Sequence, residues 1–206
     1  IIMKIEEKLK SKYLYTKKKN ILKLLYFFFQ FLKLKFRPRL LYSNWGVDLI
    51  ISDIFKKNRK KGIYIDVGCH HPLINNNTYI LHKSGWKGIN IDLDFSSIDM
   101  FNYFRPKDDN IMTALSNTKG QTDLYFFHNR APKNTISKSR GKGAKSIKKI
   151  EVNTLDNIIR NSKFKINDID FLSIDVEGNE LNVLKGLNFK KYRPKIILIE
   201  FIKPKY

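Results

Sequence analysis

Two adjacent histidines follow an acidic residue and a glycine in the segment YIDVGCHHP, which spans residues 64–72. Histidines can bind a metal ion, a glycine turn can admit a nucleotide, and either feature can be purely structural. Adjacent residues on a turn point in different directions, and no cysteine or spaced third histidine completes a zinc site. We therefore expect no metal here. One imidazole should face a ligand while the other packs, and we favour His71 over His70 for the pocket.

Asp66 and Gly68 make the same segment a candidate cofactor-binding turn. Ligands of open α/β sheets bind beyond the carboxyl ends of the strands, where a glycine lets the backbone approach the ligand. The dinucleotide pattern GxGxxG is absent, because His70 stands where the second glycine would be, so a pyrophosphate has a poor cradle. A cofactor without a pyrophosphate fits better. Asp92, twenty-four residues past Gly68, is placed to accept hydrogen bonds from ribose hydroxyls, and Asp94 is the alternative.

Further carboxylates lie at the ends of two later apolar runs, FLSIDVEG and PKIILIEF. Asp175 and Glu177 flank one run end, where either could orient or deprotonate an acceptor hydroxyl. For Glu177 a second interpretation is equally good, since carboxylates are favoured ahead of a helix N-terminus. Glu200 lines a substrate pocket or marks the point where its strand enters water.

An alternation of apolar runs and helical stretches begins at residue 62. The runs are continuously apolar rather than alternating, which is typical of parallel strands that are covered on both faces. The predicted fold class is therefore a doubly wound, mostly parallel α/β domain of the Rossmann-like kind. We predict strands at 62–68, 87–94, 110–117, 169–178 and 194–201, with helices at 77–85, 95–104 and 179–187.

A basic segment interrupts this alternation between the third and fourth strands. Two additional strands are expected at 122–127 and 148–155, and the Gly/Ser/Lys-rich loop between them belongs to residues 130–149, which carry eight Lys or Arg and no acid. Such a loop either closes over an anionic substrate or remains a solvated excursion.

Most of the positive charge lies in an N-terminal extension. The formal net charge is +21, and residues 1–62 hold seventeen Lys or Arg against four Asp or Glu. This surplus attracts polyanions, although Lys also accumulates on solvated faces when coding is AT-rich. The aromatic run at 21–36 is too short and too lysine-punctuated to span a bilayer, and no small-residue cleavage site follows it. As a helix, this run places Leu25, Phe28, Phe29 and Leu32 on one face and Lys23, Gln30 and Lys33 largely elsewhere. Residues 17–39 therefore either make peripheral contact with an anionic membrane or pack on the domain or on a missing partner.

Several segments of the chain resemble the successive blocks of the FkbM family of S-adenosylmethionine-dependent methyltransferases. They are the segments quoted above together with NTYILHKSGWKGINIDLD, TLDNII and SIDVEGNELNVLKG. The resemblance implies a class I methyltransferase fold, with S-adenosylmethionine as cofactor and a hydroxyl of a sugar, glycan or secondary metabolite as acceptor. It implies that Asp66 and Gly68 contact the methionine part of the cofactor, that Asp92 contacts the ribose, and that Asp175 faces the transferred methyl. The expected catalytic residues are Asp175, His71 and Glu177, and the expected cofactor-binding residues are Asp66, Gly68, His70, Asp92 and Ser116.

Methyl transfer requires an acceptor oxygen in line with the methyl group and the removal of one proton. We assign that proton to Asp175, with His71 as the reserve base. A nucleic-acid methyltransferase is less favoured, because DVEG stands where base-amino methylation uses an Asn/Asp-Pro-Pro-Tyr stretch. A non-catalytic membrane-associated module is the other alternative.

The chain divides into a basic extension at 1–41 and a methyltransferase domain at 42–206, from which we expect the two final strands of the sheet to be missing. A single cysteine indicates a reducing compartment, hence the cytoplasm or the inner face of the membrane.

Overall fold

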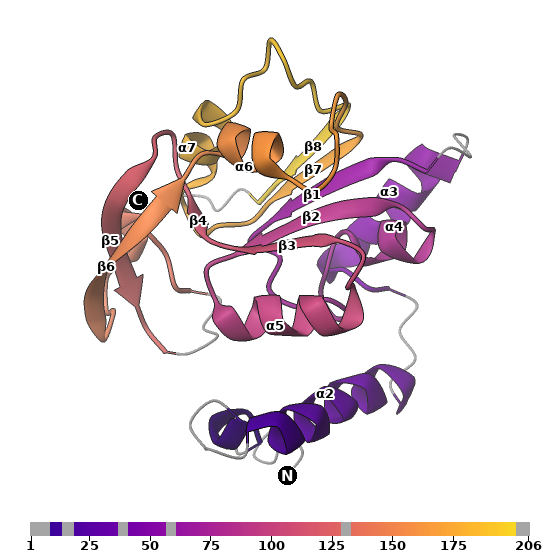
Figure 1. Ribbon diagram of the computed structural model, residues 1–206, viewed down its shortest axis with the longest axis vertical. Coiled ribbons are helices and arrows are strands. Elements are labelled where there is room, and N and C mark those ends of the chain that lie inside the picture. The colour runs from indigo at the N-terminus through magenta and orange to yellow at the C-terminus, as the bar shows by residue number, and fades with distance from the viewer. Residues whose placement is uncertain (1–8, 14–18, 37–40, 57–60, 129–132, 201–206) are drawn as a thin grey trace.

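The computed structural model describes residues 9–13, 19–36, 41–56, 61–128 and 133–200. The predicted run at 17–39 and the predicted strand at 194–201 therefore lie partly outside the described residues. Within the described part, a parallel sheet carries helices on both faces, and a long N-terminal helix lies at one end of the molecule (Figure 1).

The central sheet has five strands, all parallel, in the order β3-β2-β1-β7-β8. Their register brings the strand ends together, since Val67 of β1 is paired with both Ile91 of β2 and Ile174 of β7. The order reverses beside β1, where doubly wound folds bind their ligands. The predicted fold class is confirmed. The strands are β1 (Ile63–Val67), β2 (Lys87–Asp92), β3 (Asp109–Met112), β7 (Phe171–Ile174) and β8 (Ile196–Ile199).

Side chains on both faces of β1 are buried in a core, which explains why helices cover both faces of the sheet. Ile65 and Val67 face one core, which contains α6 (Leu155–Asn161) and α7 (Glu180–Lys185). Tyr64 faces the opposite core, shared with residues of α3 and α4. Figure 1 shows α6 and α7 on one side of the sheet and α5 on the other. The helices of the second face are α3 (Val47–Lys56), α4 (Tyr79–Lys83) and α5 (Phe95–Phe104).

The prediction of a single strand at 110–117 is wrong, because the chain passes there from the central sheet into a second sheet. The Thr113 amide still donates to the Asp92 carbonyl at 3.0 Å, but the Ser116 amide donates to the Asn153 carbonyl at 2.8 Å. The second sheet has the order β4-β6-β5, with β5 antiparallel to β6. Its strands are β4 (Ala114–Leu115), β5 (Gly120–Phe126) and β6 (Ser146–Asn153). Of these, β5 and β6 correspond to the two additional strands predicted from the sequence at 122–127 and 148–155.

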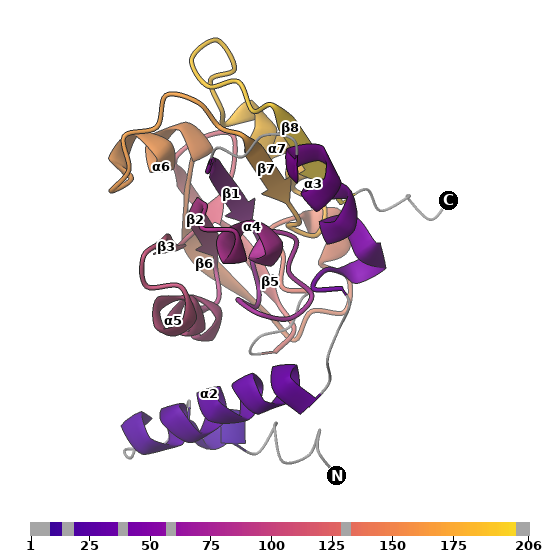
Figure 2. The ribbon, with the colours of Figure 1, turned by 90° about the vertical axis from the view of Figure 1, so that its right-hand side faces the viewer.

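The N-terminal helix α2 (Lys19–Phe36) packs on α5, which is one of the two outcomes that the sequence left open. Tyr26 and Phe27 are fully buried against Met100 and Phe104 of α5. Lys23 Nζ lies 2.5 Å from an oxygen of Asp99. In both Figure 1 and Figure 2, α2 lies on the side of α5 that faces away from the sheet. Among the described helices, none has the length and apolar character needed to cross a membrane.

Candidate functional site

A cleft of about 300 Å³ opens at the carboxyl ends of the central strands. It lies between the turns that follow β1, β2 and β7, and the segment at 134–136 closes its opposite side. Six of the predicted site residues line it, together with Asp94 and Glu200. These six are Asp66, Gly68, His70, Asp92, Asp175 and Glu177.

Gly68 is required because two strands approach closely at the turn. Its φ is +79°, in the left-handed region that favours glycine. A β-carbon at this position would lie 1.8 Å from the backbone oxygen of Asp175. The Gly68 amide donates to the Ile91 carbonyl at 2.8 Å, so the turn also bridges β1 to β2. The glycine thus brings three strand ends together at the cleft.

The structure exchanges the roles expected for the two histidines. His70 lines the cleft, with φ at +49°, whereas His71 is buried outside the lining. His71 Nδ1 accepts the backbone amides of Leu73 and Ile74 at 3.0 and 3.2 Å, and its Nε2 lies 3.3 Å from Gln30 Oε1 of α2. The expectation that His71 faces the pocket as a reserve base is therefore wrong, because both its nitrogens are occupied in holding the turn.

Asp92 and Asp94 have different surroundings at the end of β2. Asp94 caps α5, where its carboxylate accepts the Ser97 amide at 3.1 Å. Asp92 accepts the backbone amides of His70 and Asp94 at 2.8 Å each, and thereby ties the β1 turn to β2. Each carboxylate oxygen has a second acceptor position. Of the two, Asp92 is the better candidate for a ribose, since capping already orients Asp94 toward the helix.

Asp66 is buried beneath the cleft and holds its floor. One oxygen accepts both Thr78 Oγ1 at 2.8 Å and Asn76 Nδ2 at 2.9 Å. Burial raises the pKa of this carboxyl, and the hydrogen bonds and Arg105 only partly oppose that rise. The contacts show that Asp66 fixes the 76–78 segment, whatever else it contacts.

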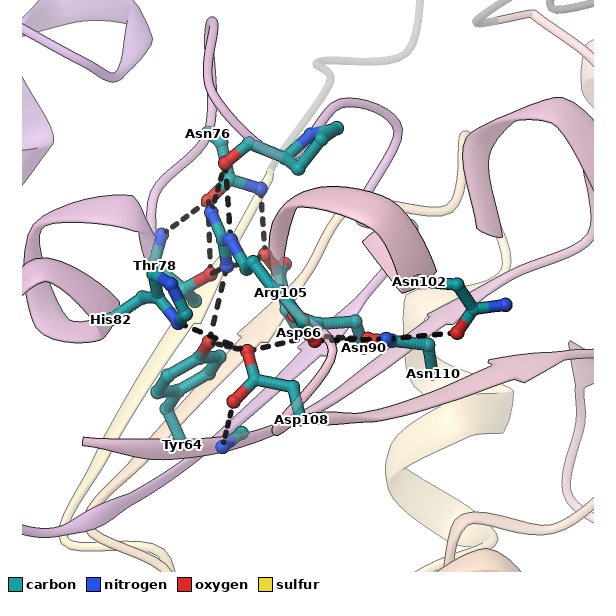
Figure 3. A network of polar contacts seen from close by, with 12 residues as sticks. Tyr64, Asp66, Asn76, Thr78, His82, Asn90, Asn102, Arg105, Asp108 and Asn110 are labelled. Carbon is teal, nitrogen blue, oxygen red and sulfur yellow. Dashed lines mark hydrogen bonds and ion pairs between the residues drawn. The ribbon is translucent and has the colours of Figure 1, made fainter. Parts of the chain in front are cut away.

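A fully buried arginine lies behind this floor (Figure 3). Arg105 donates to Asn76 Oδ1 at 2.8 Å, to Thr78 Oγ1 at 3.0 Å and to Tyr64 OH at 3.1 Å, and two of its nitrogens reach the Pro72 carbonyl. It therefore clamps both ends of the loop that follows Gly68. No sequence pattern indicated this role, because Arg105 simply follows the helix predicted at 95–104.

Asp108 balances the charge of Arg105 in the same network. It accepts Tyr64 OH at 2.5 Å and Asn90 Nδ2 at 3.2 Å, and His82 Nδ1 lies 3.3 Å from it. Burial works against its ionisation, but the contacts with His82 and Tyr64 outweigh that effect and hold the pKa of Asp108 below its usual value. Burial also raises the pKa of Tyr64. The floor of the cleft thus lies on a buried hydrogen-bonded network in which the charges of Arg105 and Asp108 offset each other.

Asp175 follows β7 directly, lines the cleft and is exposed to solvent there. Desolvation raises the pKa of its carboxyl to about 8, and a hydrogen bond with Glu200 and the negative charges of Glu200, Glu177 and Asp66 add to the rise. Asp175 follows β7 and Glu200 follows β8, its neighbour in the sheet, so their two carboxyl groups lie close together at the carboxyl edge of the sheet. Asp175 therefore keeps its proton to a higher pH than an ordinary carboxyl group does, and a cation in the cleft would favour its ionisation.

Glu177 pairs with the basic segment rather than with the following helix. Its Oε2 lies 2.7 Å from an Arg140 nitrogen, and its backbone oxygen accepts Thr135 Oγ1 at 2.9 Å. Glu180 takes the local position near the helix instead, since its carboxylate accepts the Val176 and Gly178 amides. These contacts bring residues 134–140 across the cleft beside the end of β7.

Ser116 does not line the cleft. Its side chain contacts Asn117 after the chain has passed into the second sheet. Sequence reasoning also missed a set of uncharged polar side chains in the lining, although the run NNN at 75–77 could have indicated some of them. The missed lining residues are Asn44, Asn75, Asn76, Asn77, Thr113, Asn134, Thr135 and Asn179.

Among the residues that the structure describes, six with carboxylate side chains line the cleft. None of the lining residues is Lys or Arg. Within those residues, no group of three His, Cys, Asp or Glu side chains is arranged to hold a metal ion. The parallel sheet, the order reversal at β1 and the glycine turn define an α/β protein of the Rossmann-like class with a ligand cleft at the strand ends.

Comparison with known families identifies the class of enzyme. The model of the methyltransferase FkbM domain matches residues 66–206, so the chain belongs to this family and is a methyltransferase. No curated protein and no solved structure matches the chain.

Proposed function

We propose that this protein transfers the methyl group of S-adenosylmethionine to a hydroxyl of an uncharged sugar, glycan or secondary metabolite. The observation that carries the proposal is the acid-lined cleft, in which Asp175 has a pKa near 8 at the end of β7. Membership of the methyltransferase family supplies the reaction class.

The residues present fit this cofactor. A sulfonium is a cation, and the six carboxylates of the lining favour a cation over an anion. Asp92 lies in the lining at the end of β2, where a carboxylate can accept hydrogen bonds from ribose hydroxyls. Gly68 allows close approach of the backbone at the turn. When bound, the cofactor supplies an electrophilic methyl group, and all other steps fall to the side chains of the cleft.

Asp175 is the proposed general base. A base is most effective when its pKa lies near the operating pH, which the value of about 8 satisfies. Asp175 accepts a hydrogen bond from the acceptor hydroxyl and takes its proton as the new bond forms, and Glu200 shares the proton. The uncharged lining residues, such as Asn77 and Thr135, hold other hydroxyls of the acceptor.

An uncharged acceptor fits the lining better than an anionic one, which was one of the two interpretations of the basic segment. Arg140 of the basic segment is engaged by Glu177, and the three lining residues from that segment are Asn134, Thr135 and Ile136. A phosphate or carboxylate entering the cleft would meet repulsion from the carboxylates without a described Lys or Arg to offset it.

The test compares cofactor binding and turnover for Asp175→Asn in the full chain. We expect the variant to bind S-adenosylhomocysteine within about threefold of wild type while turnover on neutral sugars falls by about 10²–10⁴. Asp123→Asn, an identical change on β5 outside the cleft, is the matched control and should leave both quantities unchanged. Absence of cofactor binding by the wild-type chain would favour a non-catalytic module. Near wild-type turnover in Asp175→Asn refutes the assignment of the base.

For the compartment we propose the cytoplasm. Cys69 is the single cysteine of the chain, and it is free and buried. Burial raises the pKa of its thiol well above the usual value, so it has little tendency to react.

A further inference from the structure

The outward side of α2 is a continuous apolar surface. It consists of Ile21, Leu24, Leu25, Phe28 and Phe31, each between 47% and 65% exposed, and we call these residues the outer face. At 100° per residue they fall within about one third of the helix circumference. The opposite side of the helix carries the buried Tyr26, Phe27 and Gln30. One helix thus has an apolar inner side against α5 and an apolar outer face in solvent.

The position of Lys23 makes the outer face free of charge. Lys23 is the only charged residue between Asn20 and Leu32. It turns inward, where its ammonium forms an ion pair with Asp99 and lies 5.6 Å from the centre of the Phe27 ring. Tyr13 OH donates to the same Asp99 carboxylate at 2.6 Å. The lysine that interrupts the apolar run in the sequence is therefore absent from the outer face in the folded protein.

In the sequence, basic residues flank the apolar run that carries the outer face. From Lys8 to Val47 the sequence has eleven Lys or Arg and no Asp or Glu. Lys17, Lys18 and Lys19 precede the apolar run, and the cluster that follows it consists of Lys33, Lys35, Arg37 and Arg39. An uncharged apolar surface between cationic clusters is typical of helices that lie in the interface of an anionic lipid bilayer.

We propose that the outer face of α2 docks this protein on an anionic membrane surface, with the helix parallel to the membrane plane. A second copy of the chain fits less well. In either orientation, pairing two α2 helices places a cationic cluster of one copy against a cationic cluster of the other. Five apolar side chains also make a small patch beside the about 20–30 residues per side of a standard protein interface.

The inner side of α2 makes this docking rigid. Tyr26 and Phe27 anchor the helix to α5, and Gln30 lies 3.3 Å from His71 in the turn that leads out of the cleft. Both views place α2 at one end of the molecule, beyond α5 (Figures 1 and 2). A bilayer contacted by the outer face therefore holds the catalytic domain in one orientation rather than on a loose tether.

The direct test is flotation of the full chain with vesicles of pure phosphatidylcholine and with vesicles containing 30% phosphatidylglycerol. We expect flotation with the anionic vesicles only, and a loss of binding at high salt, since screening weakens the contribution of the basic clusters. Leu24→Glu/Phe28→Glu should reduce partitioning by about tenfold or more, because two apolar side chains no longer enter the interface.

Matched controls separate docking from general charge and folding effects. Ile147→Glu/Leu181→Glu makes the same kind of change at two similarly exposed positions, 60% and 63%, on β6 and α7. This control should float like wild type. The outer-face variant should keep the wild-type Tm, since its substituted side chains lie outside the core.

Insertion is tested by Phe28→Trp in a Trp45→Phe background. Its emission should shift to shorter wavelength with anionic vesicles, whereas Ile147→Trp in the same background should not respond. The proposal is overturned if wild type fails to float, if the outer-face variant floats equally well, or if Phe28→Trp shows no shift. It is also overturned if light scattering shows a dimer that the outer-face variant abolishes, which would make this face an interface between copies.

Discussion

The preference of the cleft for a sulfonium over its neutral product should increase with pH. Asp175, with a pKa near 8, gains its negative charge over the range in which most carboxylates are already ionised. A sulfonium interacts favourably with the ionised form, whereas the neutral sulfide of S-adenosylhomocysteine is indifferent to it. The ratio of the two dissociation constants therefore isolates Asp175, because both ligands carry the same nucleoside and amino-acid groups.

The pKa sets the size of the effect. A carboxyl with a pKa near 8 is about 3% ionised at pH 6.5 and about 90% ionised at pH 9. If only the ionised form favours the cation, the affinity ratio should change by up to about 30-fold across this interval. Isothermal titration of both ligands at four or five pH values measures it.

Asp175→Asn should abolish the change, while Asp123→Asn should retain it. A ratio that stays constant with pH in wild type, or that changes equally in Asp175→Asn, would refute the assignment of the raised pKa to this carboxyl.

The ligand-free protein should show the same ionisation as a loss of stability. Because the folded-state pKa of Asp175 is raised, the unfolded chain releases this proton near pH 4 while the folded protein retains it until about pH 8. Stability therefore falls as the pH rises through that window. Asp175→Asn should flatten this dependence in thermal scans between pH 5 and 8, and an unchanged slope contradicts the reasoning.

Three further substitutions test how the cleft is built. Gly68→Ala should lower the free energy of unfolding by about 2–5 kcal/mol in a denaturant titration, because a β-carbon overlaps the Asp175 backbone oxygen at a positive φ; a stable variant would contradict the close approach. Arg105→Met should cost about 3–5 kcal/mol by leaving the buried Asn76 and Thr78 oxygens and the Pro72 carbonyl without their charged donor, with Arg105→Lys less severe; equal losses would argue against specific recognition by the guanidinium. Asp92→Asn should weaken S-adenosylhomocysteine binding by about 1–3 kcal/mol in calorimetry, and unchanged affinity would remove Asp92 from the ribose site.

Local sequence patterns were sufficient for β1, β2, β7 and β8 because the segments that contain these strands are short and mainly apolar. Segments such as GIYIDVG at 62–68 are short, rich in branched side chains and bounded by glycine, and these features act within a few residues of one another. The positions of Asp66, Asp92 and Asp175 followed, since the carboxyl ends of parallel strands meet at one edge. The division at Thr113 could not be predicted, because both halves of 110–117 have the same local character and differ only in the partner strand.

Four features depended on tertiary structure. His71 and His70 have the same local sequence, but Gln30 of α2 and two backbone amides engage only His71. Arg105 could be buried only because the Pro72 carbonyl, Asn76 and Thr78 converge on it from a distant loop.

The raised pKa of Asp175 needs Glu200, twenty-five residues away, at the end of the neighbouring strand. Lys23 leaves the outer face because Asp99 of α5 holds it. The sequence by itself determined which segments are strands and which side chains are available at their ends. The tertiary structure decided the charge states and orientations of those side chains, because desolvation and ion pairing depend on groups that the chain brings together only when it folds.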